Sequence, residues 1–386
     1  MSTYDQQSLI SFGPRVRKSP FFEATRRYGA KSFSVYNHTY LATSYGDTTA
    51  EYWSLVNDVT LWDVTCQRLV EIAGPDAFRL VQYLTPRDMS NCEVGQCQYM
   101  ALTNEEGGII NDAIQFRVGE DRFWLSPGDG DVLMWAMGVA VNSGMNAKVC
   151  DPDISTLQLQ GPKSPLVAKS LFGKWAAELK FFRIAETELD GVPVFLSRTG
   201  WSGELGYELY LADAAYGDQL WERIMEAGKP YNIAAIAPST IRSIEGGLLS
   251  YVSDIRLDDN PFTIGMGRFV ELDQPDDFIG REALKKIKEE GPRRRLIGIE
   301  MHGDAIPSSN HEYWDITDGG EAIGHVTRCV WSPRLAKNIG WANVLTSHSE
   351  VGTDFTVVSP FGEYAATVCE APWFPTQIKI PDEMKG

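Results

Sequence analysis

Residues 198–210 concentrate, in one short stretch, side chains that could contact a ligand. Three closely spaced glycines, at positions 200, 203 and 206, indicate a connection that bends sharply or passes close to something bulky. A plain hairpin accounts for the glycines but does not require the polar and aromatic residues around them. Those residues are Arg198, Trp201, Glu204, Tyr207, Glu208 and Tyr210. Glu208 and Tyr210 stand two apart on an expected strand and so project to one face, which suits a flat heterocycle that donates hydrogen bonds.

A second candidate is Asp112, which follows Asn111 inside a strand expected over residues 109–117. The rest of that strand is largely apolar. Burying an unpaired carboxylate is costly, so Asp112 must lie in water at an edge strand or bulge, or be bonded and aimed into a cavity. The sequence leaves both alternatives open. It also leaves two open for Tyr36, in an aromatic stretch over residues 31–45 that we expect to be irregular: lining a pocket, or packing a domain seam.

Composition narrows the class of protein. The 386 residues are 43% hydrophobic and 23% charged, which is ordinary for a globular protein of two or three domains. The net charge of −17 argues against nucleic acid and against an anionic membrane surface as partners. No apolar run reaches the length of a membrane span, and the first residues lack a basic-then-apolar leader, so we expect a cytoplasmic protein. The six cysteines and five histidines are scattered, which predicts reduced thiols and no metal site.

The expected elements indicate an α+β protein with three domains. A strand ending in Gly-Pro and followed by a helix occurs twice, over residues 70–84 and 157–171, which favours two similar α+β halves. Further helices are expected over residues 49–57, 214–227, 239–249 and 283–290. Beyond residue 295 the pattern changes to short strands between Gly and Pro turns, typical of a small β-barrel. The resulting domains are 1–151, 152–292 and 293–386, with discontinuous contributions to the first allowed.

Several motifs together resemble the aminomethyltransferase family, which comprises the glycine-cleavage T-protein and its relatives. Residues 198–208, RTGWSGELGYE, are similar to the family's glycine-rich and acidic signature. GGIIND at 107–112 is similar to its motif ending in a catalytic aspartate, and IGHVT at 323–327 to a segment of its C-terminal barrel. Within the family, YNH at 36–38 and LTPRD at 84–88 are more similar to the branch that demethylates dimethylsulfoniopropionate.

The resemblance implies a three-domain aminomethyltransferase-like fold, with two related α/β halves and the barrel arranged around a central funnel for tetrahydrofolate. It implies that Asp112 is catalytic and lies near the reacting folate nitrogen. The folate site would include Tyr99, Asp112, Phe182, Arg198 and Glu208, with Glu208 on the pterin. The small methylated substrate would lie among Tyr36, Trp201 and Tyr210.

The resemblance further implies methyl transfer from a small methylated substrate, of the dimethylsulfoniopropionate type, to N5 of tetrahydrofolate. In-line displacement of a neutral thioether needs positioning rather than a nucleophile triad or a metal, which agrees with the residues present. Three alternatives remain: an O- or N-demethylase of another metabolite, a glycine-cleavage aminomethyltransferase, and a folate-binding protein without activity. Glu204 stands where the demethylase branch usually has lysine, which would matter if that loop recognises a substrate carboxylate. The oligomeric state stays open, a homodimer included.

Overall fold

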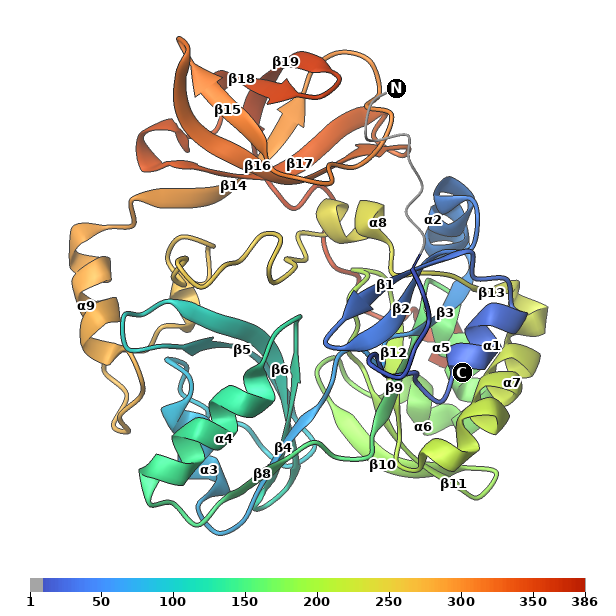
Figure 1. Ribbon diagram of the computed structural model, residues 1–386. Helices are drawn as coiled ribbons and strands as arrows, with labels where there is room; N and C mark the ends of the chain where they lie inside the picture. The colour runs from blue at the N-terminus through green and yellow to red at the C-terminus, as the bar shows by residue number, and fades with distance from the viewer. Residues whose placement is uncertain (1–9, 386) are drawn as a thin grey trace.

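A five-stranded antiparallel sheet forms the first of three units, which we call the first lobe (Figure 1). In the computed structural model, which describes residues 10–385, the strand order of this sheet is β5-β6-β7-β4-β8. β6 lies between two hydrogen-bonded neighbours, and many of its side chains alternate between buried and half-buried positions. The elements of the first lobe are β4 (Val70–Ala73), α3 (Ala77–Tyr83), β5 (Cys97–Thr103), β6 (Ile109–Gly119), β7 (Arg122–Pro127), α4 (Val132–Ser143) and β8 (Lys148–Cys150).

The second lobe is built on a six-stranded sheet of order β10-β11-β12-β9-β3-β13. Helix α7 covers this sheet with a face of Leu220, Trp221, Ile224 and Met225, whose spacing is that of one side of a helix. The elements of this lobe are α1 (Phe22–Arg27), β1 (Ser32–Tyr36), β2 (Thr39–Ser44), α2 (Thr48–Asn57), β3 (Val59–Asp63), β9 (Ser155–Gln160), α5 (Ser164–Phe172), α6 (Lys174–Glu178), β10 (Ile184–Leu189), β11 (Val192–Ser197), β12 (Gly206–Leu211), η2 (Ala214–Tyr216), α7 (Gly217–Gly228), η3 (Lys229–Tyr231) and β13 (Ile233–Ala235).

Sheet membership crosses the expected domain limits. The limit near residue 151 falls between β8 and β9, which lie in different sheets. However, β3 pairs with β9 through Trp62 and Gln158, so the chain before residue 64 packs with the second lobe. Phe21 and Ala24 also lie in the hydrophobic core of that lobe. The second lobe is therefore assembled from an early and a middle part of the sequence.

The third unit is a closed six-stranded barrel, drawn in orange to red in Figure 1. Its elements are β14 (Arg294–Met301), β15 (Trp314–Asp318), β16 (Glu321–Ser332), β17 (Lys337–Leu345), η5 (Thr346–His348), β18 (Asp354–Ser359) and β19 (Gly362–Cys369). The long connection from the second lobe to the barrel contains α8 (Thr240–Glu245), η4 (Gly267–Phe269) and α9 (Arg281–Glu290). After the barrel the chain returns to the second lobe, where Ile380 joins the core and α10 (Asp382–Lys385) contacts α6.

Two sequence-based expectations for local structure are wrong. Residues 31–45 are not irregular, because β1 and β2 form an antiparallel hairpin that turns at Asn37 and His38. The helix expected over residues 239–249 ends at Glu245, where Gly246 and Gly247 follow and Gly247 adopts a φ of +71°. Because the helix ends there, the chain that follows it can run between the three units.

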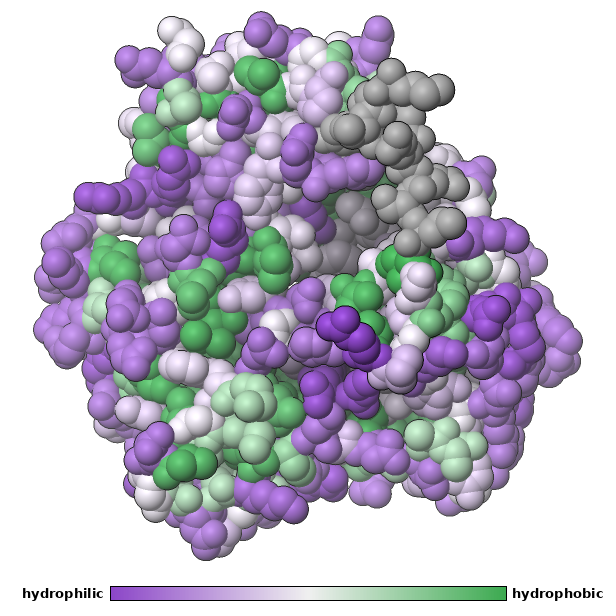
Figure 2. Space-filling view, viewed as in Figure 1, coloured by the Kyte–Doolittle hydropathy of each residue, from purple (hydrophilic) through white to green (hydrophobic). Residues whose placement is uncertain are grey.

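The two lobes pack through an aromatic seam. Trp124 of the first lobe lies 4.7 Å from Phe195 of the second, measured between ring centroids, and Phe116 lies 5.3 Å from Tyr210. On the face drawn in Figure 2, hydrophobic side chains gather over α4, where Met134 and Val141 are exposed. Among residues 10–385, no helix has both the length and the apolar character needed to cross a bilayer.

Candidate functional site

Asp112 lies on a central strand and faces the space between the three units. The Tyr99 hydroxyl, on neighbouring strand β5, donates a 2.6 Å hydrogen bond to Asp112 Oδ2. The other oxygen, Oδ1, is buried without a hydrogen-bond partner. Burial raises the pKa of Asp112 to about 6, and the Tyr99 hydrogen bond acts against that rise. Of the two alternatives left open by the sequence, the structure therefore argues against a solvated carboxylate on an edge strand, because β6 is paired on both sides and Asp112 is bonded to Tyr99.

Four further groups share the electrostatic environment of Asp112. The negative charge of Asp112 adds to the burial that raises the pKa of Tyr36 well above its usual value. The same charge contributes, after burial, to a Tyr251 pKa of about 12. Asp254 raises the pKa of Asp112, whereas Arg328 lowers it. Tyr36 thus lies near the carboxylate, and its contact with the methylated substrate stays a prediction. The sequence did not single out the other three residues as site residues.

Arg328 and Asp254 form a buried ion pair that joins the barrel to the segment that follows α8. Arg328 Nη2 lies 2.5 Å from Asp254 Oδ2, and its Nε lies 2.7 Å from the same oxygen. The hydroxyl of Thr327 donates to Asp254 Oδ1 at 2.7 Å. Arg328 also sits 5.7 Å from the ring of Trp201. This pair fixes the barrel against the segment that follows α8.

Trp201 is half-buried and held at both its backbone and its ring. Its backbone N–H donates to Gln158 Oε1 at 3.2 Å, and its indole N–H donates to the Leu249 carbonyl at 3.1 Å. With Arg328 near the ring, the indole has little freedom to rotate. An aromatic face fixed in this way is suited to a cationic ligand.

Glu208 is the centre of a second buried carboxylate site. Gln158 Nε2 donates to its Oε1 at 2.8 Å, while the hydroxyls of Thr199 and Tyr210 both donate to its Oε2. Burial raises the pKa of Glu208, and these three donors oppose the rise. Oε1 therefore keeps one unused lone pair for a ligand donor. Gln158 links this site to Trp201, because its other amide atom accepts from the Trp201 backbone.

Glu204, the acidic residue of the glycine-rich loop, does not face an open site. Arg242 Nε on α8 lies 2.6 Å from its Oε1, and the two side chains are 1% and 9% exposed. Arg242 also donates to the Gly203 carbonyl at 3.1 Å, although its Nη1 is buried without a partner. The negative charge of Glu204, which stands where the demethylase branch usually has lysine, is thus neutralised by Arg242 of the same chain.

We expect Glu204→Ala to lower the free energy of unfolding by about 3–5 kcal/mol, since it leaves the Arg242 charge buried and unpaired. Chemical denaturation measures the change. The matched control is Glu23→Ala, which removes an exposed partner of Arg26 and should cost less than about 1 kcal/mol. Equal effects of the two substitutions would show that the buried pair does not stabilise the loop.

Of the remaining predicted site residues, Arg198 and Tyr210 are deeply buried and Phe182 is half-buried. Arg198 is 2% exposed, and its guanidinium donates to the backbone carbonyls of Leu179, Gly206 and Ile378. Phe182 has a φ of +58° and is bonded through its backbone to Cys97 and Arg198, at the junction of the lobes. Tyr210 is fully buried in the aromatic seam, with its hydroxyl on Glu208. Direct ligand contacts of these three residues stay predictions.

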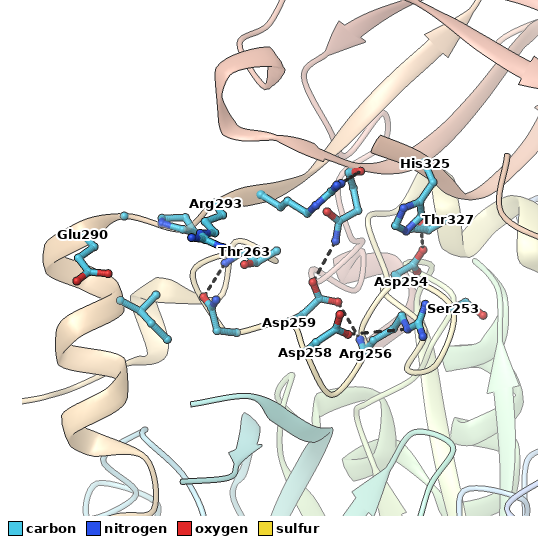
Figure 3. A pocket seen from close by; sticks show the side chains of 16 residues that line it. Ser253, Asp254, Arg256, Asp258, Asp259, Thr263, Glu290, Arg293, His325 and Thr327 are labelled. Atoms are coloured by element: carbon cyan, nitrogen blue, oxygen red, sulfur yellow. Dashed lines mark hydrogen bonds and ion pairs between the residues drawn. The ribbon is translucent and has the colours of Figure 1, made fainter. Parts of the chain in front are cut away.

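A cavity of about 570 Å³ adjoins this site from the side of the barrel. Figure 3 shows Asp254, Arg256 and Asp259 on the segment that follows α8 and, above them, His325 and Thr327 of the barrel, with Thr327 bonded to Asp254. Asp254 belongs both to the lining of this cavity and to the surroundings of Asp112. The cavity carries both arginines and acidic residues, so its charge alone does not select one sign of ligand.

Comparison with known proteins decides the family. The model described as the GCVT N-terminal domain matches residues 21–274, and that of the glycine cleavage T-protein C-terminal barrel domain matches residues 294–375. The chain belongs to the aminomethyltransferase family. This is a family of tetrahydrofolate-dependent one-carbon transferases, as the sequence motifs implied.

Individual relatives point to two activities within that family. The chain is 34% identical to the dimethylsulfoniopropionate demethylase DmdA of Ruegeria pomeroyi, over 93% of this chain and 98% of the relative. It is 33% identical to an aminomethyltransferase of Halalkalibacterium halodurans, with the same coverage of both chains. The crystal structure of the glycine cleavage system aminomethyltransferase T from Bartonella henselae superposes with a TM-score of 0.84 at 23% identity, covering 94% of this chain and 99% of that one. This likeness confirms the predicted fold.

Proposed function

We propose that this family member takes a methyl group from a small methylated cation of the dimethylsulfoniopropionate type and transfers it to N5 of tetrahydrofolate. The observation that carries the proposal is the buried Asp112 carboxylate with one unpaired oxygen, near Tyr36. The 34% identity to a dimethylsulfoniopropionate demethylase supports the choice of donor. Tetrahydrofolate supplies the nucleophilic nitrogen that accepts the methyl group.

Asp112 would handle the charge and the proton of this transfer. The sulfur–methyl bond breaks with its electron pair staying on sulfur, and a new carbon–nitrogen bond forms, so positive charge moves toward the nitrogen. A carboxylate next to that position stabilises the charge and accepts the released proton. A pKa of about 6 leaves Asp112 mostly ionised at neutral pH yet basic enough to be protonated during turnover.

The other side chains would bind and orient the two reactants. Glu208, with its free lone pair on Oε1, offers an acceptor to the donor groups of a pterin. The faces of Trp201 and Tyr36 would hold the methylated cation, with each contact contributing about 0.5–2 kcal/mol. Positioning of this kind can supply roughly 7–11 kcal/mol of the barrier reduction, which explains how transfer proceeds without a nucleophilic side chain.

A glycine-cleavage aminomethyltransferase is the second candidate, because the 33% identity to such an enzyme extends over an equal share of the chain. It would use the same two carboxylates with a different one-carbon donor. An O- or N-demethylase of another metabolite would also retain these residues. A folate-binding protein without activity fits least well, because such a protein has no evident need for Asp112.

One assay separates these candidates. The protein is incubated with tetrahydrofolate and, in parallel, with sulfonium, quaternary ammonium, methoxy and aminomethyl-lipoyl donors. Formation of 5-methyltetrahydrofolate only from the sulfonium supports the proposal. Formation of methylenetetrahydrofolate from the aminomethyl-lipoyl donor would replace it with glycine cleavage, and 5-methyltetrahydrofolate from another methyl donor would change the substrate class.

A further inference from the structure

Two asparagine side chains, one from each lobe, form hydrogen bonds with a three-residue loop of the first lobe. The loop, Gly128–Asp129–Gly130, follows β7 and precedes α4. Asn111 of β6 accepts from the Gly128 N–H at 2.8 Å and donates to the Asp129 carbonyl at 2.8 Å. Asn37 of the β1–β2 turn approaches from the second lobe. It donates through its side chain to the Gly128 carbonyl at 2.8 Å and accepts from the Gly130 N–H at 2.7 Å.

A fifth bond completes this arrangement. The backbone N–H of Asn37 donates to Asp129 Oδ1 at 2.8 Å. We call these five hydrogen bonds the glycine-loop bridge. Both asparagines are buried, with 5% exposure at Asn37 and none at Asn111, so water competes little for the bonds.

The glycines of the loop are required by close packing against the site. A Cβ atom at Gly128 would lie 2.8 Å from Tyr251 Cβ and 3.3 Å from Asp112 Oδ1. A Cβ atom at Gly130 would lie 3.1 Å from Asn111 Nδ2, and Gly130 also has a φ of +133°. The loop therefore rests directly against the unpaired oxygen of Asp112.

The bridge joins the immediate neighbours of two site residues. Asn37 follows Tyr36, and Asn111 precedes Asp112. We propose that Asn37 is a positioning residue, which through the glycine-loop bridge fixes Tyr36 of the second lobe relative to Asp112 of the first. This inference rests on the proposed function for its consequences in catalysis, but the bridge itself is a property of the chain.

Asparagine is well suited to this position for two reasons. Its φ of +46° lies in the left-handed region, which asparagine tolerates better than most residues. Its amide supplies one donor and one acceptor, matching the carbonyl of Gly128 and the N–H of Gly130. Aspartate would keep the acceptor but lose the donor, and would set a negative charge beside Asp129.

The test compares Asn37→Ala with His38→Ala. His38 is the matched control, because it is the next residue, has a φ of +59° and is exposed, with one 3.7 Å contact to Asp131. We expect Asn37→Ala to raise the KM for the methylated donor and to lower kcat/KM about a hundredfold, since displacement of about 1 Å has such an effect. Tetrahydrofolate affinity should change less than about threefold. His38→Ala should leave kcat/KM within about threefold.

A second readout does not depend on activity. Hydrogen exchange of the wild-type protein should show protected amides at Asn37, Gly128 and Gly130, and Asn37→Ala should speed exchange across residues 32–44 but not in α5. If the wild-type protein transfers no methyl group from any donor, the proposed function fails while this exchange result still decides whether the bridge exists. Unchanged exchange in Asn37→Ala would overturn the bridge.

A double-mutant cycle separates positioning from general stability. Tyr36→Phe should lower kcat/KM in the wild-type background but have a much smaller effect in Asn37→Ala, because Tyr36 is already displaced there. Additive effects of the two substitutions would overturn the assignment of Asn37 as a positioning residue, as would equal losses of folate affinity and donor turnover.

Discussion

Replacing Asp112 with asparagine is expected to lower turnover about a thousandfold while tetrahydrofolate still binds. The asparagine oxygen can accept the Tyr99 hydrogen bond that Asp112 Oδ2 accepts now, so the local geometry is retained. The amide can neither carry a negative charge nor accept the released proton. Initial rates of 5-methyltetrahydrofolate formation measure the first effect, and calorimetric titration with tetrahydrofolate measures the second. Normal turnover by this variant would remove Asp112 from the mechanism.

The pH dependence of the wild-type rate follows from the same group. Since the Asp112 pKa is about 6 and the ionised form is the active one, turnover should fall to half near pH 6 and to about one tenth near pH 5. The residual rate of Asp112→Asn should be flat across this range. A wild-type profile without a transition between pH 5 and 7 would show that ionised Asp112 is not required.

Stability measurements show whether lost activity reflects unfolding. Burial raises the Asp112 pKa in the folded state above the usual value of 3.8, so the folded protein binds this proton more tightly than the unfolded chain. Ionisation of Asp112 therefore costs stability as pH rises from about 4 to about 6. Asp112→Asn removes that cost, and its free energy of unfolding at pH 7.5 should equal or exceed that of the wild-type protein. Urea denaturation at pH 4 and pH 7.5 tests this difference.

Local elements of the fold were predictable because their residues carry local signals. β11 spans Val192–Ser197, where an apolar run with β-branched residues favours a buried strand. α2 and α5 follow clear helix signals, including the Asp47 side chain that caps α2. The pairing of β3 with β9 was not predictable in this way, because strand order depends on contacts between residues about a hundred positions apart.

The same holds for the candidate site. Residues were predictable from their local sequence, whereas contacts between residues far apart in the sequence were not. Asp112 was identified because a carboxylate inside an apolar strand is conspicuous, but its environment was not. Arg328 lies in the barrel, and its partner Asp254 lies in an irregular segment with no periodic pattern. A buried ion pair between two such positions produces no local pattern of residue spacing from which it could be predicted. The acidic charge of Glu204 was visible in the sequence, whereas its neutralisation by Arg242 required the folded geometry.

The second large effect is expected at Glu208, where Glu208→Gln should weaken tetrahydrofolate binding about a hundredfold and change kcat at saturating folate much less. A hydrogen bond to a charged group contributes about 1.5–3 kcal/mol, and a buried carboxylate accepts more such bonds than an amide. The glutamine NH₂ would also face donors on Gln158, Thr199 or Tyr210, all of which now donate to the carboxylate. Calorimetric titration measures the dissociation constant.

Two controls determine whether this loss reports a direct contact. Glu188→Gln changes an exposed residue on β10 of the same sheet and should leave folate affinity unchanged. Tyr210→Phe keeps the buried ring but removes one donor to Glu208, so it should weaken folate binding less than about tenfold. If Tyr210→Phe weakens binding as much as Glu208→Gln, the orientation of the carboxylate matters as much as its charge. If neither substitution changes the affinity, the pterin does not bind at Glu208, and the folate site must be sought nearer Asp112 and the adjoining cavity.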